Sequence, residues 1–267
     1  MKIKFLGTGG ALGSPIWSCD CKTCISDNQK NKRQRSVVWV QIPKLKNPKE
    51  FINVIIDFGQ DFSRQLINNN IKHIDYAFLT HEHWDHSAEI WQLMWAKNCK
   101  LCAHKDVWES FFKDTKRRES LQEMSRKKLG KEAVQIFDFE PLVMEGVSID
   151  TVKLLHGKNY TTKTTPCYGY VFRSEKFSFA YLSDFNDVLE PEKLEGLDLI
   201  VSDGCTWEDG GIGHIGVFRS VELFKQFKPK RMLLTHMNHE VEYQECLEYL
   251  KQFGNIAPAY DGLIIEV

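Results

Sequence analysis

The sequence predicts an α/β fold in a single domain that spans residues 1–267. Short apolar runs with strand character recur along the whole chain, and stretches with helical spacing lie between several of them. A chain of 267 residues exceeds the commonest domain size, yet a single sandwich or α/β domain often reaches about 200–250 residues. The content of 42% hydrophobic and 27% charged residues is that of a soluble globular protein.

Composition narrows the setting in which the protein works. No apolar stretch approaches the roughly 18 residues that a membrane span requires, and residues 1–5 show no secretory signal. We therefore expect a cytoplasmic protein without membrane contact. Eight cysteines in a chain of this length form no disulfide framework, so we expect reduced thiols. The net charge of -1 identifies no partner, because it neither supports nor excludes nucleic acid.

The first half of the chain combines a glycine-rich loop with alternating strands and helices. Residues 7–15 contain four glycines and predict a tight turn whose backbone passes close to another part of the molecule. Strands are predicted at residues 2–6, 37–42, 54–57, 75–79 and 99–102, and helices at residues 62–69, 88–96 and 111–131. We expect Trp91 and Trp95 to pack into the core. The basic stretch between Lys113 and Lys131 favours a solvated helix face over a polynucleotide-binding surface.

In the second half, polar residues follow one predicted strand after another. Strands are predicted at residues 147–155, 168–173, 177–182, 197–202 and 231–234, and a helix at residues 217–227. His156, Asp184 and His236 each come within two residues of a strand end, and the glycine-rich residues 210–213 present His214 ahead of the helix. Each residue alone could be a cap or a turn residue. Their common position at strand ends favours one convergent site.

The strongest functional signal is T-H-E-H-W-D-H at residues 80–86. Directly after an apolar strand it places four metal-preferring side chains on a loop and the first helical turn: His81, His83, Asp85 and His86. Imidazole and carboxylate are good ligands for zinc and manganese, so we interpret the motif as a metal site. Asp57, at the end of the predicted strand 54–57, is either a simple turn residue or a carboxylate that orients a metal-bound histidine.

Cysteines form two short motifs, and they predict different roles. Cys19, Cys21 and Cys24 follow the spacing C-x-C-x-x-C, at which thiolates can converge on one tetrahedral ion with a fourth ligand from elsewhere. Incidental buried thiols are the less favoured interpretation. Cys99 and Cys102 lie in a predicted strand, where they point to opposite faces, so we expect both to be structural.

Together these motifs resemble the metallo-β-lactamase superfamily. The pattern H-x-H-x-D-H at residues 81–86, followed by strand-end residues His156, Asp184 and His236, is highly specific. More narrowly, the glycine-rich start, the C-x-C-x-x-C cluster and the spacing of His236 and His239 resemble the PhnP-like branch, which comprises phosphoribosyl cyclic phosphodiesterases. The resemblance implies a four-layer αββα sandwich with metals at one edge, whereas periodicity alone predicts only mixed α and β structure.

The resemblance also implies cofactors and a reaction. The cofactors would be two divalent ions, zinc or manganese, and one structural zinc. The first ion would be held by His81, His83 and His156, the second by Asp85, His86 and His236, with Asp184 bridging them; the structural zinc would be held by Cys19, Cys21, Cys24 and His239. A hydroxide shared by the two ions would attack the phosphorus of a small phosphodiester. Asp85 and His214 would be the catalytic residues, with His214 as the general acid.

One short loop would serve both implied sites, because His236 and His239 are only three residues apart. We therefore expect the structural zinc to hold the loop that presents His236. Cys21→Ser should then lower activity as well as zinc content.

Other functions stay open. A tRNA 3′-end nuclease of the same superfamily would dock RNA on the basic stretch, but such enzymes lack the C-x-C-x-x-C cluster. PqqB, a cofactor-biosynthesis protein, shares a similar glycine-rich start, and residues 17–19 lean slightly towards it. A flavodiiron oxidoreductase would have Glu in place of His83, and a non-catalytic zinc module is disfavoured by the complete ligand set. We expect a small phosphodiester rather than nucleic acid as the partner, and a homodimer is left open.

Overall fold

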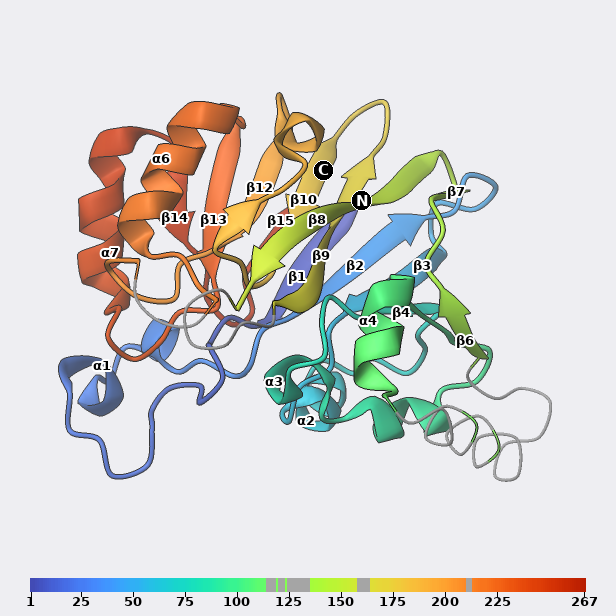
Figure 1. Cartoon of the computed structure of the whole chain (residues 1–267), viewed down its shortest axis with the longest axis horizontal. Helices are drawn as coiled ribbons and strands as arrows, with labels where there is room; N and C mark the ends of the chain where they lie inside the picture. The colour runs from blue at the N-terminus through green and yellow to red at the C-terminus, as the bar shows by residue number, and fades with distance from the viewer. Residues whose placement is uncertain (114–118, 120–122, 124–134, 158–163, 210–212) are drawn as a thin grey trace.

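The computed structural model describes residues 1–113, 119, 123, 135–157, 164–209 and 213–267. Two β-sheets face each other, with helices on their outer sides (Figure 1). The first sheet has the order β15-β1-β2-β3-β4-β5-β6, and the second the order β11-β8-β9-β10-β12-β13-β14, with β7 paired to β8. This arrangement confirms the predicted αββα sandwich.

The strands and helices have the following bounds. The first sheet contains β1 (Lys2–Gly7), β2 (Val37–Pro43), β3 (Phe51–Ile56), β4 (Tyr76–Phe78), β5 (Lys100–Ala103), β6 (Gln135–Asp138) and β15 (Ile264–Glu266). The second contains β7 (Leu142–Met144), β8 (Val147–His156), β9 (Thr165–Arg173), β10 (Ser178–Tyr181), β11 (Asp187–Val188), β12 (Leu199–Asp203), β13 (Arg231–Thr235) and β14 (Ile256–Pro258). The α-helices are α1 (Lys22–Ile25), α2 (Phe62–Asn68), α3 (Trp84–Ser87), α4 (Lys105–Phe111), α6 (Val217–Phe227) and α7 (Tyr243–Leu250). The 3₁₀-helices are η1 (Gln29–Asn31), η2 (Ile90–Trp95), η4 (Pro191–Leu194) and η5 (Lys251–Phe253).

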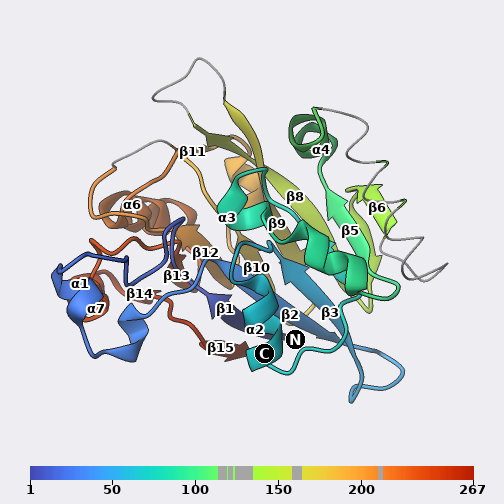
Figure 2. The same ribbon diagram turned by 90° about the horizontal axis from the view of Figure 1, so that it is seen from below.

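In the described part of the chain, three hydrophobic clusters hold the layers together. One lies between the sheets, where Phe78 stacks on Tyr170 with ring centroids 4.8 Å apart. The other two lie on the outer faces, where α6 and α7 cover the second sheet, and α2, η2 and α4 cover the first (Figures 1 and 2). Cys99 belongs to the outer cluster of the first sheet and Cys102 to the cluster between the sheets, so their predicted opposite orientation is confirmed.

Strand direction brings the polar strand ends to one edge of the sandwich. Strands β3, β4 and β5 run parallel to one another, as do β10, β12 and β13. Strand β8 is antiparallel to β9, which is antiparallel to β10, so β8 and β10 point the same way. Because the carboxyl ends of parallel strands meet at one edge, the residues that follow β3, β4, β8, β10 and β13 converge there.

Two helix predictions were wrong in part. Residues 88–96 are not one α-helix: α3 ends at Ser87, and η2 is a 3₁₀-helix whose period of three buries Ile90 and Leu93. Trp91 and Trp95 are therefore 45% and 60% exposed instead of packing into the core. The helix predicted at residues 111–131 does not begin at Phe111, where α4 ends; residues 119 and 123 are helical, and the rest of the range beyond residue 113 lies outside the described residues.

Candidate metal centre

Seven histidine and aspartate side chains meet at this edge. They come from the loop after β4, the start of α3, the end of β8, and the residues that follow β10 and β13. Two groups have their potential ligand atoms within 4.8 Å of one another: His81, His83, His156 and Asp184, and Asp85, His86, Asp184 and His236. All are buried except the partly buried His83. The structure thus brings together every active-site ligand that the resemblance implied.

The spacing of the ligand atoms fits a pair of metal ions. Asp184 Oδ2 lies 3.5 Å from His81 Nε2, 3.2 Å from His86 Nε2 and 3.4 Å from His236 Nε2, so it faces both groups. His156 Nε2 is 3.0 Å from His83 Nδ1. Ligand bonds of about 2.1 Å arranged tetrahedrally would place neighbouring ligand atoms about 3.4 Å apart. The group shared by both sets, Asp184, has the position of a bridging carboxylate.

Unpaired polar atoms point to the same conclusion. Among the described residues, His81 Nε2 and Asp184 Oδ1 are buried and have no hydrogen-bond partner, and His86 Nε2 faces only the carboxylates of Asp85 and Asp184, at 3.3 and 3.2 Å. Leaving a buried polar atom unpaired costs about 1–3 kcal/mol, so such a concentration requires a binding partner. A divalent cation at each group would satisfy these atoms, and the residues present fit one.

Asp57 contacts the ring nitrogen of His86 that faces away from the metal centre. Its Oδ2 lies 2.8 Å from His86 Nδ1, and its Oδ1 accepts hydrogen bonds from the backbone N and the hydroxyl of Thr80, at 2.9 and 3.0 Å. The contact fixes the tautomer of His86 and leaves its Nε2 to face the centre. Close packing requires Gly59, since a Cβ there would lie 1.8 Å from the carbonyl oxygen of Asp85. Of the two roles that the sequence left open for Asp57, the structure supports the carboxylate that orients a histidine.

Burial and neighbouring charges keep several of the seven side chains in the protonation state that binds metal. Burial lowers the pKa of His81 well below its usual value and the pKa of His156 to about 4. Burial would raise the pKa of Asp184, but the charges of His236 and His86 hold it well below its ordinary range. Neutral imidazoles and ionised carboxylates are the forms that bind divalent metals.

His86 differs, because several carboxylates surround it. Burial lowers its pKa, but Asp184, Asp85 and Asp57 together raise it well above its usual value. In the metal-free chain, a proton on His86 thus balances the carboxylates that a divalent cation would neutralise.

His214 lies beside the centre and is held by a carboxylate. Its Nδ1 lies 2.9 Å from Asp203 Oδ2, and its ring stacks on that of His236 at 4.8 Å. Burial lowers the pKa of His214, but Asp203 and Asp184 more than offset this and raise it to about 9. The side chain is 18% exposed, so a ligand can reach it. Residues 210–212 of the predicted glycine-rich loop lie outside the described residues.

The sequence placed Asp203 at a strand end, but it assigned neither Asp203 nor Cys205 a role in the site. The structure places them with His214 and His236 in a further group whose ligand atoms lie within 4.8 Å of one another. Asp203 is the last residue of β12, so its strand-end position was the available signal. Cys205 belongs to no cysteine motif in the sequence, so nothing pointed to it; the structure shows it as a buried free thiol.

The N-terminal cysteines and His239 form a separate cluster. His239 Nδ1 lies 3.3, 3.4 and 3.6 Å from the Sγ atoms of Cys19, Cys21 and Cys24. Zinc bonds of about 2.3 Å to sulfur and 2.0 Å to nitrogen would give tetrahedral S to N separations of about 3.5 Å. All three cysteines are free thiols, so the geometry fits one zinc ion.

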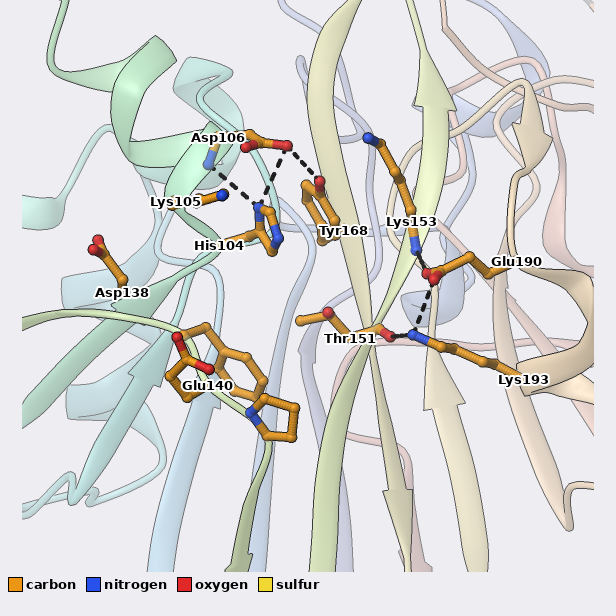
Figure 3. A pocket seen from close by; sticks show the side chains of 12 residues that line it. His104, Lys105, Asp106, Asp138, Glu140, Thr151, Lys153, Tyr168, Glu190 and Lys193 are labelled. Atoms are coloured by element: carbon orange, nitrogen blue, oxygen red, sulfur yellow. Dashed lines mark hydrogen bonds and ion pairs between the residues drawn. The ribbon is translucent and has the colours of Figure 1, made fainter.

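A polar cavity of about 570 Å³ lies between β5 and α4 on one side and β8 and β9 on the other (Figure 3). Lys153 lines it from β8, three residues before His156. Tyr168 lines it from β9 and donates its backbone N–H to the carbonyl of Thr80. The cavity offers both positive and negative side chains to a polar group, and none of the seven candidate metal ligands lines it.

The sequence of residues 52–237 matches the family described as "Beta-lactamase superfamily domain". With two facing sheets and a histidine- and aspartate-rich edge, the chain belongs to the metallo-β-lactamase superfamily. Among the described residues, no helix combines the length and apolar character needed to cross a membrane.

Similar proteins place the chain near the PhnP-like branch. A diphosphatase of the PhnP family is 26% identical, with a TM-score of 0.79, and the match covers 100% of this chain and 97% of that one. Zinc-bound PqqB from Methylobacterium extorquens has a TM-score of 0.81 at 18% identity, with 100% of both chains covered. An octanoyltransferase from Porphyromonas gingivalis is 24% identical over 98% of this chain and 51% of its own, so the chain spans about half of that relative.

Proposed function

We propose that this metal-dependent hydrolase is a phosphodiesterase that acts on a small cyclic phosphodiester. The observation that carries the proposal is the set of seven ligand side chains, six of them buried, with Asp184 facing both groups and Nε2 of His81 without a hydrogen-bond partner. The similarity to a PhnP-family diphosphatase supports phosphoester chemistry. The unpaired atoms support metal binding, which a non-catalytic zinc module would share, so turnover is the property that separates the two.

The chain's residues would divide the work as follows. His81, His83 and His156 would hold one divalent ion and Asp85, His86 and His236 the other, and Asp184, which faces both groups, would contribute to both. Bound zinc or manganese would supply Lewis acidity, which acidifies water and neutralises phosphate charge. Asp57 keeps His86 oriented through the contact at 2.8 Å. The leaving oxygen of the phosphodiester then requires a proton donor.

His214 is suited to donate that proton. Asp203 accepts from Nδ1, so the other ring nitrogen remains for the leaving oxygen. In the metal-free chain, Asp203 and Asp184 raise the pKa of His214 to about 9, and Asp203, which is not among the implied ligands of the two ions, would continue to favour the protonated ring once metal is bound. An alkoxide leaving group is strongly basic, so a positioned acid should accelerate its departure on the order of 10²-fold or more.

Turnover assays test the proposal. Bis(p-nitrophenyl) phosphate should be hydrolysed when manganese or zinc is added to metal-free protein, and His81→Ala should abolish the turnover. A panel should then compare a cyclic ribose phosphate, a linear diester, a diphosphate ester and 4-nitrophenyl octanoate, the last as a control for acyl chemistry. We expect the cyclic diester to be preferred. Turnover of the octanoate alone, or of no phosphoester with any ion, would refute a phosphodiesterase.

A further inference from the structure

The cysteine cluster and the metal centre meet in one short loop after β13. His236 opens this loop and His239 follows three residues later. The backbone of Met237 is hydrogen-bonded to the glycine-rich loop. Its N–H donates to the carbonyl of Thr8 at 3.0 Å, and its carbonyl accepts from the N–H of Gly10 at 3.3 Å. Since residues 8–10 lead into the cysteine cluster, the two segments form one unit.

Gly10 shows how tightly the unit is packed. A Cβ at this position would lie 2.6 Å from Asn238 Oδ1 and 3.2 Å from the carbonyl oxygen of His236. A methyl group at position 10 would push the Asn238 side chain aside and press on the backbone of His236. The close approach predicted for the glycine-rich segment is thus an approach to the ligand loop.

Arg33 holds the other side of the loop. Its side chain is only 2% exposed, and it donates from Nη1 to the carbonyl of Asn238 at 3.0 Å and from Nη2 to the carbonyl of Val241 at 2.7 Å. His236 itself has φ of +56°, a left-handed conformation that a non-glycine residue keeps only where its surroundings impose it. The position of His236 is accordingly set by its supports, and one of these, the cluster with His239, depends on a bound ion.

We propose that zinc in the cluster of Cys19, Cys21, Cys24 and His239 controls the metal affinity of the site formed by Asp85, His86, Asp184 and His236. The coupling acts through the placement of His236. This inference rests on the proposed function, because that function requires metal at the second site. The site formed by His81, His83 and His156 takes no residue from the loop and keeps its affinity. Coupling between two binding equilibria is reciprocal, so metal at the second site also stabilises zinc in the cluster.

Metal content at buffered free zinc tests the coupling directly. Wild-type protein, Cys21→Ser and the control Cys102→Ser, which changes a core thiol outside the cluster, are dialysed against the same zinc buffers and analysed by mass spectrometry for bound metal. We expect Cys21→Ser to lose its cluster zinc and to bind the second active-site ion 10-fold or more weakly, the size typical of disturbed support for a metal ligand. Cys102→Ser should match wild type.

A double variant makes the test decisive. Cys21→Ser combined with His236→Ala should lose no more active-site metal than His236→Ala alone, because both changes act on one ligand. If Cys21→Ser loses its cluster zinc and still binds two active-site ions with wild-type affinity, the coupling is wrong and the proposed function stands. If the wild type binds metal only in the cysteine cluster, the proposed function itself fails.

Discussion

Replacing Asp57 by asparagine tests whether the strand-end carboxylate organises the metal centre. Asp57 contacts three donors: His86 Nδ1, and the backbone N and hydroxyl of Thr80. Asparagine has nearly the same shape but only one acceptor oxygen, so at least one buried donor loses its partner. That loss corresponds to about 1–3 kcal/mol, or roughly 5- to 150-fold in metal affinity if it falls on His86.

The assay is zinc or manganese affinity measured by competition with a chelator of known affinity. Asp75→Asn is a matched control, since Asp75 also contacts a histidine and a backbone N–H, those of His73 and Asn53, but lies just before β4 at the opposite end of the strand. We expect Asp57→Asn to weaken metal binding about 10- to 100-fold and Asp75→Asn to leave it unchanged. Equal affinity in wild type and Asp57→Asn, with both folded, would refute the orienting role.

Three further outcomes follow from the structure. His214→Ala should slow hydrolysis of an alkyl phosphodiester by about 10²-fold and affect p-nitrophenyl esters far less, because nitrophenolate leaves without a proton; equal losses in kcat would contradict an acid role. Phe78→Ala, in the cluster between the sheets, should lower the free energy of unfolding by about 3–5 kcal/mol in urea titrations, whereas Trp17→Ala, at a side chain 94% exposed, should change it by less than about 0.5 kcal/mol. Chelation should lower the melting temperature in calorimetry, because ions that bind only the folded chain add about 4 kcal/mol per site at 1,000 times Kd; an unchanged melting temperature would argue against bound metal.

Much of the site was predictable because its residues lie at strand ends. The motif at residues 80–86 and the later His156, Asp184 and His236 follow apolar runs that are easy to recognise. The resemblance supplied what spacing could not, which is that these runs belong to two facing sheets whose carboxyl ends meet. The assignment of His239 to the cysteine cluster also came from the resemblance, and the structure places it there.

The features that the sequence did not predict correctly depend on tertiary packing. Trp91 and Trp95 have the spacing of one helical face, but η2 turns with period three and buries Ile90 and Leu93 instead. Asp203 was visible as a strand-end carboxylate, yet its pairing with His214 depends on how α6 and β12 pack. Arg33 supports the loop that follows His236, and this role had no sequence signal. Arg33 lies among the polar and basic residues 27–35, where a buried arginine cannot be told from a solvated one.

The central claim is that the edge of the sandwich holds two divalent ions in addition to the cluster zinc. Anomalous diffraction from crystals of protein purified without chelators, recorded at the zinc and manganese absorption edges, tests it most directly. We expect two peaks about 3.5–4 Å apart, with Asp184 between them, and a third peak among Cys19, Cys21, Cys24 and His239. A single peak at the cysteine cluster, with none beside Asp184 even after soaking in both metals, would contradict the binuclear centre.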